Sequence, residues 1–330
     1  MGIYGYSLIM AATCFLLTVI VLRKLIPILK SKKMGQKILE IGPRWHKSKD
    51  GTPTMGGLSF LAVITVVGAV LLAVAYFTGD ADSKLCAGGA LTLFLAVSNG
   101  CVGIFDDWKK LQKKQNEGLT PPQKYLLQLV CAAVYLLGMY HEGLVDSILR
   151  IPFTSIEVEL GLFYYLLVLI LITGIVNSVN LTDGIDGLLS MISFVIGGFL
   201  FLAAVRSGNI PLGVIGCGIV GGVLGFLVYN YHPARVFMGD TGSLFLGGLF
   251  AGSAFMLATP FLVLIYGIVF VLESASVILQ VGCYKLTKKR IFRMAPIHHH
   301  FEMCGWSELK ICYVFSGITL LFCILSYFAL

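Results

Sequence analysis

Long apolar stretches separated by short polar loops run from one end of the chain to the other. A helix that crosses the hydrocarbon core of a bilayer needs roughly 20 mostly apolar residues. Ten stretches approach that length: residues 7–29, 57–77, 85–105, 125–141, 161–180, 188–205, 211–231, 243–258, 261–284 and 311–330. The pattern predicts an all-α polytopic integral membrane protein with about ten transmembrane helices, which form a single transmembrane domain over residues 1–330.

Basic residues fall in alternate loops of this arrangement. One set of loops holds 21 of the 24 lysine and arginine residues and covers 22–56, 106–124, 181–187, 232–242 and 285–310. Cytoplasmic loops carry an excess of basic residues, so this set is predicted to face the cytoplasm and both termini to lie outside. In the outward segment 142–160, apolar positions such as Ile151, Phe153 and Ile156 predict a short β-hairpin.

Composition supports the membrane assignment. Hydrophobic residues make up 57% of the chain and charged residues 12%, whereas about a quarter of a soluble chain is charged. This excludes a soluble globular protein, a disordered chain, collagen and a coiled coil. The net charge of +7 follows from the basic loops, so it indicates membrane orientation rather than nucleic-acid binding, and acidic lipids or phosphate substrates are candidate partners of these loops. The nine cysteines lie in apolar stretches without a CxxC pair, which favours buried side chains over a zinc site or disulfides.

Acidic, amide and imidazole side chains gather at the predicted cytoplasmic helix ends. They come from segments far apart in the chain: Asp106, Asp107, Asn177, Asn180, Asp183, Asp186, Asp240 and His298 to His300. Because all of these segments reach the same membrane face, the topology predicts an active site formed by cytoplasmic loops and helix ends.

Asp106 and Asp107 stand together at the end of the third predicted helix. Two adjacent acids are unfavourable at a helix C-terminus because of the helix dipole. Their charge is expected to be compensated by Lys109 or Lys110, or by a metal ion. Carboxylate oxygens favour Mg²⁺, which is often held by one or two carboxylates and substrate phosphates. A solvated helix end is the simpler alternative.

A polar segment follows the fifth predicted helix. Asn177 and Asn180 lie three residues apart and share a helix face, and Asp183 and Asp186 each precede a glycine in a tight turn. The backbone N–H groups of such a turn can hold a base edge or a phosphate. An ordinary polar turn has the same composition.

Two glycine-containing segments offer further candidates. Asp240 stands near glycines on both sides, so an ion or ligand can approach the backbone closely, or Asp240 caps the helix that follows. Residues 51–57 (GTPTMGG) open the second predicted helix shortly after Lys49, and they include Thr54. A small-residue turn beside cations suits an anion or a mobile loop.

Three consecutive histidines, His298 to His300, lie in the last cytoplasmic loop. Adjacent side chains diverge in any regular backbone, so contact with phosphate or proton handling is favoured over a zinc site, and surface polarity is the third option. Glu273 lies within the ninth predicted span. An acid inside a membrane is a functional candidate, and a structural acid bonded to a neighbouring helix is equally consistent with its position.

Taken together, these motifs resemble the polyprenyl-phosphate N-acetylhexosamine-1-phosphate transferases. The Asp106-Asp107 pair and the segment with Asn180, Asp183 and Asp186 match that superfamily as a whole. Residues 51–57 (GTPTMGG) and 295–302 (APIHHHFE) more specifically resemble its phospho-N-acetylmuramoyl-pentapeptide-transferase branch, and the resemblance covers essentially the whole chain.

The resemblance implies a reaction and its setting. UDP-N-acetylmuramoyl-pentapeptide and undecaprenyl phosphate would give undecaprenyl-diphospho-N-acetylmuramoyl-pentapeptide (lipid I) and UMP, in the first membrane step of peptidoglycan synthesis. It also implies dependence on Mg²⁺, ten spans, a homodimer, and a place in the bacterial plasma membrane with the active site on the cytoplasmic face.

Roles for single residues follow from the motifs and the resemblance. The expected catalytic residues are Asp106, Asp107, Asp240 and His299, with Asp106 as the candidate base. Asp240 is the expected Mg²⁺ ligand, supported by Asp107 or Asp183. The expected substrate-binding residues are Lys49, Thr54, Lys110, Lys124, Asn177, Asn180, Asp183, Gly184, Ile185, Asp186, Phe237, His298 and His300. Among them, residues 184–186 would read the uracil, Phe237 would stack on it, and the histidines would lie by the phosphates or the amino sugar.

Several alternatives stay open at this point. A sister transferase that uses UDP-N-acetylglucosamine is the nearest, although residues 51–57 and 295–302 argue against it. A membrane transporter is less consistent with the sequence, because transport sites lie near the bilayer midplane. For the chemical step, direct attack by the lipid phosphate and a covalent intermediate on an aspartate both fit.

Overall fold

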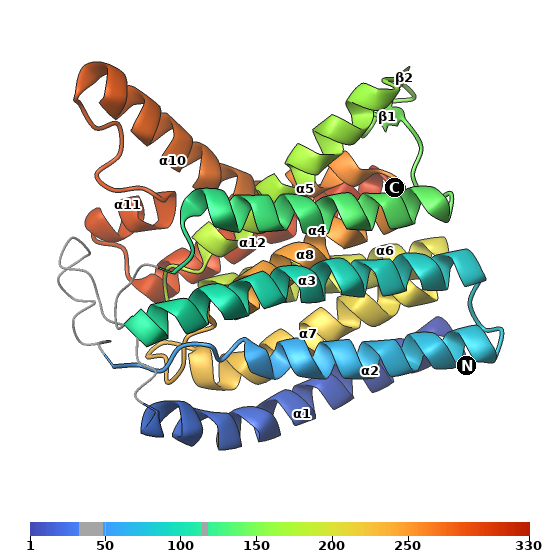
Figure 1. Ribbon diagram of the computed structural model, residues 1–330, viewed down its shortest axis with the longest axis horizontal. Helices are drawn as coiled ribbons and strands as arrows, with labels where there is room; N and C mark the ends of the chain where they lie inside the picture. Colours follow the sequence, from blue (N-terminus) through green and yellow to red (C-terminus); the bar gives the residue numbers. More distant parts are fainter. Residues whose placement is uncertain (33–48, 50, 114–117) are drawn as a thin grey trace.

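The computed structural model describes residues 1–32, 49, 51–113 and 118–330, and it consists almost wholly of helices (Figure 1). The long helices are α1 (Ile3–Ser31), α2 (Leu58–Phe77), α3 (Ser83–Lys113), α4 (Pro121–His141), α5 (Leu162–Thr182), α6 (Leu188–Ser207), α7 (Ile210–Asn230), α8 (Gly239–Met256), α10 (Ile268–Thr287) and α12 (Glu308–Phe328). Three short elements are η2 (Pro260–Leu262), α9 (Val263–Tyr266) and α11 (Ile297–Met303). The predicted all-α membrane fold is confirmed.

A small antiparallel hairpin interrupts the helices between α4 and α5. Strand β1 (Ile148–Arg150) pairs with β2 (Glu157–Glu159), with Ile148 opposite Glu159. The hairpin lies within the segment 142–160 for which the sequence predicted one.

Eight of the helices in the described part of the chain are long and apolar enough to cross a membrane: α1, α2, α3, α5, α6, α7, α10 and α12. The other two long helices, α4 and α8, match the fourth and eighth predicted spans, residues 125–141 and 243–258, which are the two shortest of the ten stretches. Polar residues account for the difference, because α4 carries Lys124 and Gln128, and α8 begins with Asp240 and Thr241. The number of ten crossings therefore stays a prediction.

The ninth predicted span, residues 261–284, is not one continuous helix. It divides into η2, α9 and α10, with a break at Gly267, whose φ of −96° and ψ of 23° depart from helical values. Beyond this break α10 leaves the direction of the other helices, as does the part of α5 near the hairpin (Figure 1).

The centre of the bundle depends on close contacts between helix backbones. Helix α8 packs against α3 and α5, and α7 packs against α1 and α6. At Gly248 a Cβ atom would lie 2.6 Å from the Cα of Ala96 in α3, and at Gly221 a Cβ would lie 2.2 Å from the carbonyl oxygen of Ala11 in α1. Small residues bring membrane helices close together in this way.

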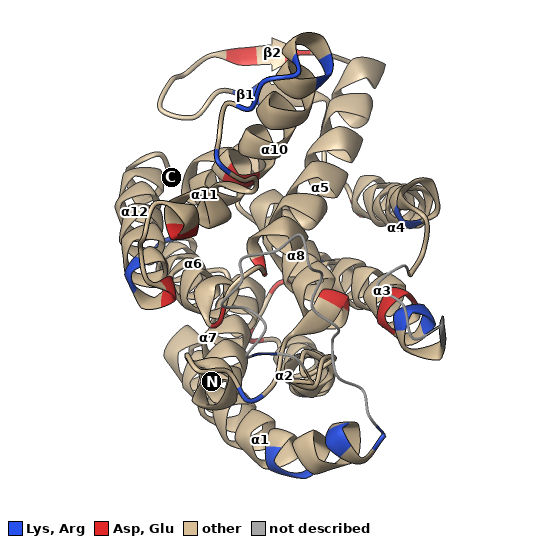
Figure 2. Ribbon diagram, turned by 90° about the vertical axis from the view of Figure 1, so that its left-hand side faces the viewer, with Lys and Arg blue, Asp and Glu red and all other residues tan. Residues whose placement is uncertain are grey.

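The two ends of the bundle differ. Both chain termini and the hairpin lie at the right-hand end in Figure 1, whereas the described parts of the five basic loops lie at the left-hand end. Figure 2 looks onto that left-hand end and shows acidic and basic positions of several helices gathered there. The alternation of loops inferred from the basic residues is therefore reproduced, and its assignment to the cytoplasm stays a prediction.

Candidate active site

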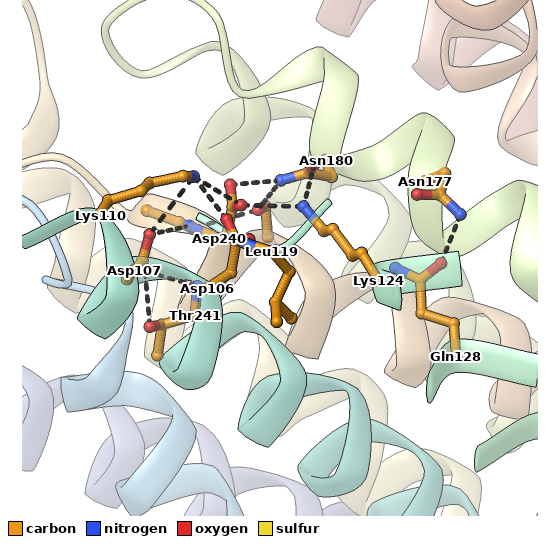
Figure 3. Close-up of polar contacts among 12 residues, drawn as sticks. Asp106, Asp107, Lys110, Leu119, Lys124, Gln128, Asn177, Asn180, Asp240 and Thr241 are labelled. Atoms are coloured by element: carbon orange, nitrogen blue, oxygen red, sulfur yellow. Dashed lines mark hydrogen bonds and ion pairs between the residues drawn. The ribbon is translucent and has the colours of Figure 1, made fainter. Parts of the chain in front are cut away.

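Three carboxylates meet at the end of the bundle that carries the basic loops. Asp106 and Asp107 come from the C-terminal part of α3, and Asp240 comes from the first turn of α8 (Figure 3). One carboxylate oxygen of each residue lies within 4.8 Å of those of the other two. The side chains of Asp106 and Asp107 are buried, and that of Asp240 is partly exposed. Segments separated by more than a hundred residues thus converge, as the topology predicted.

Two lysines neutralise most of this charge. The Nζ of Lys110 lies 2.6 Å from Asp106 Oδ2, 2.9 Å from Asp240 Oδ2 and 3.9 Å from Asp107 Oδ1. The Nζ of Lys124 lies 2.8 Å from the same Oδ2 of Asp240. Three carboxylates against two ammonium groups leave one net negative charge, so the cluster retains a field that attracts a further cation.

Asp107 lies directly at the N-terminus of α8. Its Oδ2 accepts hydrogen bonds from the backbone N of Thr241 at 2.9 Å and from the Thr241 hydroxyl at 2.7 Å, and its Oδ1 accepts from the backbone N of Asp240 at 3.3 Å. The positive end of the α8 dipole therefore offsets the unfavourable position of this acid at the end of α3. The sequence offered Asp240 as the cap of α8, and the structure assigns this contact to Asp107.

The two asparagines of α5 have different partners. Asn180 donates to Asp240 Oδ1 at 2.9 Å and to Ser243 Oγ at 2.8 Å, and its own oxygen accepts from Lys124. Asn177 lies about one turn before Asn180 in α5 and donates to Gln128 Oε1 of α4 at 2.6 Å (Figure 3). The predicted common face exists, but only Asn180 touches the acidic cluster.

Asp183 follows directly after α5. Burial raises the pKa of its carboxyl to about 8, and the nearby charges of Asp240, Asp107 and Asp186 add to the rise. Within the described residues its carboxyl makes no hydrogen bond, and only its backbone N donates, to Asn180 O. At neutral pH the carboxyl is therefore mostly protonated until a cation favours the charged form.

Asp186 belongs to a second polar cluster. Lys49 donates to its Oδ1 at 2.8 Å, the backbone N of Ala234 donates to its Oδ2 at 2.9 Å, and His232 Nδ1 lies 3.1 Å from Oδ2. Glu308, in the first turn of α12, accepts from Lys49 at 2.6 Å and from the Asp186 backbone N at 3.0 Å. Oxygen or nitrogen atoms of Asp186, His232 and Glu308 also lie within 4.8 Å of one another, with the Lys49 ammonium among them.

Thr54 and Phe237 lie in segments that run side by side. Phe237 N donates to Pro53 O at 2.8 Å, which joins the loop before α2 to the loop before α8. Gly239 links both segments to the acidic cluster, because a Cβ there would lie 2.9 Å from Thr54 Oγ1 and 2.7 Å from Asp107 Oδ2, and its φ is +73°. A side chain at this position would disturb the site, because it would clash with Thr54 and Asp107 and because the backbone conformation favours glycine.

The three histidines diverge, as expected for adjacent residues. His298 Nδ1 lies 3.1 Å from Glu273 Oε2 of α10, and both side chains are fully buried. His299 Nδ1 lies 2.5 Å from Glu302 Oε2, and His300 accepts from the backbone of the preceding loop. Because the three rings have separate partners, this arrangement does not form a three-histidine metal site. Within the described residues, His298 contacts α10 and lies against Gly184, and His300 contacts the preceding loop. No hydrogen bond or ion pair joins either residue to the acidic cluster within the described part of the chain.

Sequence reasoning missed Thr241, His232 and Glu308. Thr241 directly follows Asp240, and the sequence analysis assigned it no function. His232 and Glu308 lie in predicted cytoplasmic loops, which is the only signal that could have drawn attention to them. No local motif marks either residue, and their contacts with Asp186 appear only in the folded chain.

Comparisons with known proteins give a consistent result. The family model described as Glycosyl transferase family 4 matches residues 89–258, which include the three clustered aspartates. A protein of Geobacillus thermodenitrificans (strain NG80-2) is 43% identical over 315 residues, covering 96% of this chain and 95% of the relative. One of Clostridium perfringens (strain 13 / Type A) is 42% identical over 306 residues, covering 93% of each chain. One of Staphylococcus haemolyticus (strain JCSC1435) is 43% identical over 311 residues, covering 93% of this chain and 94% of the relative. All three relatives are named phospho-N-acetylmuramoyl-pentapeptide-transferase.

Proposed function

The chain belongs to the phospho-N-acetylmuramoyl-pentapeptide-transferase family, and from this premise we propose that it transfers phospho-N-acetylmuramoyl-pentapeptide from UDP-N-acetylmuramoyl-pentapeptide to undecaprenyl phosphate. The products are lipid I and UMP. The observation that carries the proposal for this chain is the meeting of Asp106, Asp107 and Asp240 with Lys110 and Lys124 at one end of the bundle.

A divalent cation fits this donor set. Oxygens of Asp106, Asp107 and Asp240 lie within 4.8 Å of one another, and hard oxygen ligands of this kind suit Mg²⁺. We assign Asp240 as its main ligand, with Asp107 and Asp183 in support. When bound, Mg²⁺ would supply Lewis-acid polarisation and charge neutralisation at the diphosphate. The Asp183 carboxyl, which has no hydrogen bond within the described residues, is available as an additional ligand.

The chain's own residues then position and neutralise the reacting groups. Lys110 and Lys124 already face Asp240, so their ammonium groups can turn to the phosphates of the donor and the acceptor. Phosphoryl transfer depends chiefly on such positioning and charge stabilisation. The acceptor phosphate has a second pKa near 6 and is mostly deprotonated at pH 7, and Asp106 takes any remaining proton. His299, held by Glu302, acts near the same phosphates.

Direct attack by the lipid phosphate is our preferred route. Asp106 Oδ1 accepts from Leu119 N and its Oδ2 lies 2.6 Å from the Lys110 ammonium, and these contacts stabilise the carboxylate charge and weaken it as a nucleophile. A phospho-sugar bound covalently to the protein after a single turnover without lipid would instead establish the covalent route.

The nucleotide is proposed to bind at the turn that follows α5. Gly184 is exposed, whereas Ile185 and Asp186 are buried, so the exposed edge of the turn offers backbone groups to the uracil. Phe237 supplies a partly exposed ring for stacking. The Asp186 carboxylate is buried and already accepts from Lys49 and from the Ala234 backbone N, so a contact with the base would compete with these donors.

The setting of the reaction is also part of the proposal. The chain is a membrane protein, and the site lies at the end where the basic loops gather. Since basic loops face the cytoplasm, we place the site at the cytoplasmic face of the bacterial plasma membrane. The homodimer stays a prediction from the family.

Release of UMP tests the proposed function. The purified protein should release UMP only when Mg²⁺, undecaprenyl phosphate and UDP-N-acetylmuramoyl-pentapeptide are all present. Equal turnover with UDP-N-acetylglucosamine would favour the sister transferase. Absence of UMP release from folded protein with all three components would refute the proposal.

A further inference from the structure

A fully buried acid and a fully buried histidine face each other beside the candidate site. Glu273 of α10 and His298 of α11 each have 0% exposed surface. Glu273 Oε2 lies 3.1 Å from His298 Nδ1 and accepts a hydrogen bond from the His298 backbone N at 3.5 Å. Groups of this kind are costly to bury unless they are paired, so each residue depends on the other for its place in the fold.

The far side of the His298 ring lies against the turn that follows α5. Within the described part of the chain, His298 Nε2 has no hydrogen-bond partner, and Nδ1 is held by its proximity to Glu273 Oε2 and not by a well-aligned hydrogen bond. A Cβ atom on Gly184 would lie 2.1 Å from this Nε2 and 2.6 Å from His298 Cε1. The ring therefore fills the space directly behind Gly184, and the turn cannot move toward α11 while the ring is present.

We propose that Glu273 and His298 are positioning residues for the Gly184 turn. Glu273 fixes the orientation of the His298 ring, and the ring sets the position of the turn that reads the nucleotide. His298 thus acts through Gly184 and not by touching the substrate. This inference rests on the proposed function, in which that turn binds the uridine nucleotide. A turn held in place before binding loses less entropy when the ligand arrives.

Gly184 allows this contact to be tested by a single methyl group. Its φ lies outside the left-handed region, so backbone strain does not oppose alanine. The three atoms nearest to the added methyl group would all belong to the His298 ring, at distances from 2.1 to 3.2 Å. The effect of the substitution therefore reports on the contact between the turn and the ring.

The test is a double-mutant cycle read through the KM for UDP-N-acetylmuramoyl-pentapeptide. Gly184→Ala should raise this KM about tenfold in the wild-type background and less than about threefold in a His298→Asn background, because residues in contact couple by this order. The kcat should change less than the KM. Gly174→Ala in α5, where a Cβ meets nothing within 4 Å, is the matched control. An equal effect of Gly184→Ala in both backgrounds would overturn the proposal.

Rescue at Glu273 gives a second readout. Glu273→Gln keeps an oxygen that can accept from His298 and should keep the KM within about threefold of wild type, whereas Glu273→Ala should raise it about tenfold. Glu157→Gln on the hairpin is the control. If Glu273→Ala does not fold, as judged by size-exclusion chromatography in detergent, His298→Asn takes its place. Folded Glu273→Ala or His298→Asn protein with an unchanged KM would contradict the inference. Wild-type protein without UMP release would instead count against the proposed function, and direct titration with UMP would still test the coupling.

Discussion

Replacement of Asp240 by asparagine is the most informative single change at the acidic cluster. Asp240 Oδ2 accepts from Lys110 at 2.9 Å and from Lys124 at 2.8 Å, while Oδ1 accepts from Asn180 at 2.9 Å. An amide of the same shape has one oxygen and one NH₂ group. In either orientation the NH₂ group must face a donor, so Asp240→Asn creates an unfavourable contact that no rotation removes.

The structure sets the size of the effect. A lost hydrogen bond to a charged group costs about 1.5–3 kcal/mol of stability. The cluster also loses its one net negative charge, since two carboxylates then face two ammonium groups. Unit charges about 4 Å apart interact by about 4 kcal/mol at an effective dielectric constant of about 20, which corresponds to a fall in turnover of about a thousandfold.

UMP release by purified protein at several Mg²⁺ concentrations measures this effect. Thermal unfolding in the same detergent shows whether the variant is folded. Asp146→Asn is the matched control, because Asp146 pairs with Arg150 on the hairpin at the other end of the bundle. A folded Asp240→Asn variant with turnover within tenfold of wild type would refute the assignment of Asp240 as a metal ligand.

Three further predictions concern the pH dependence, one lysine and the helix packing. Because the pKa of the Asp183 carboxyl is raised to about 8, Mg²⁺ affinity measured by calorimetry should rise by up to about tenfold per pH unit until pH 8 and then level off. Asp183→Asn should flatten this pH profile. A flat profile for the wild-type protein would contradict the reasoning. Lys124→Met should lower turnover about a hundredfold by removing an ammonium group that stabilises charge on the reacting phosphates, with Lys109→Met as the control that keeps turnover. Gly248→Leu should destabilise the protein by about 3 kcal/mol or more through overpacking against α3, seen as a lower melting temperature that Gly282→Leu does not share; equal melting temperatures would disprove the tight α3–α8 contact.

Much of the fold is determined by local sequence and could therefore be predicted. Apolar stretches of suitable length become helices in a bilayer because backbone groups must be paired within each segment. The break at Gly267 was not predicted, because the apolar pattern continues through it without a polar residue. Helices α4 and α8, which are not among the eight helices long and apolar enough to cross a membrane, correspond to the two shortest apolar stretches of the sequence.

The sequence predicted most residues of the candidate site, but it did not predict which residues each of them contacts. Topology alone brought Asp106, Asp107 and Asp240 to one end of the bundle. It could not show that Asn180 meets Asp240 while Asn177, on the same helix face, meets Gln128. That choice depends on how α4 and α8 pack against α5.

Contacts between distant segments were the hardest to foresee. Lys49 and Glu308 lie 259 positions apart, and their contact at 2.6 Å joins the loop before α2 to the start of α12. Neither residue lies in a sequence motif that predicts contact with the other. Pairings of this kind are decided by the assembled bundle and leave no periodic trace in the sequence.

The shared location of the two chain ends has a practical consequence for experiments. Both termini and the hairpin lie at the end of the bundle opposite the acidic cluster (Figure 1). An affinity handle, a fluorescent domain or a surface tether attached at either terminus would therefore leave the reacting face unobstructed. Immobilised in this way, the protein would present its nucleotide and cation sites to the solution, ready for binding measurements on an oriented sample.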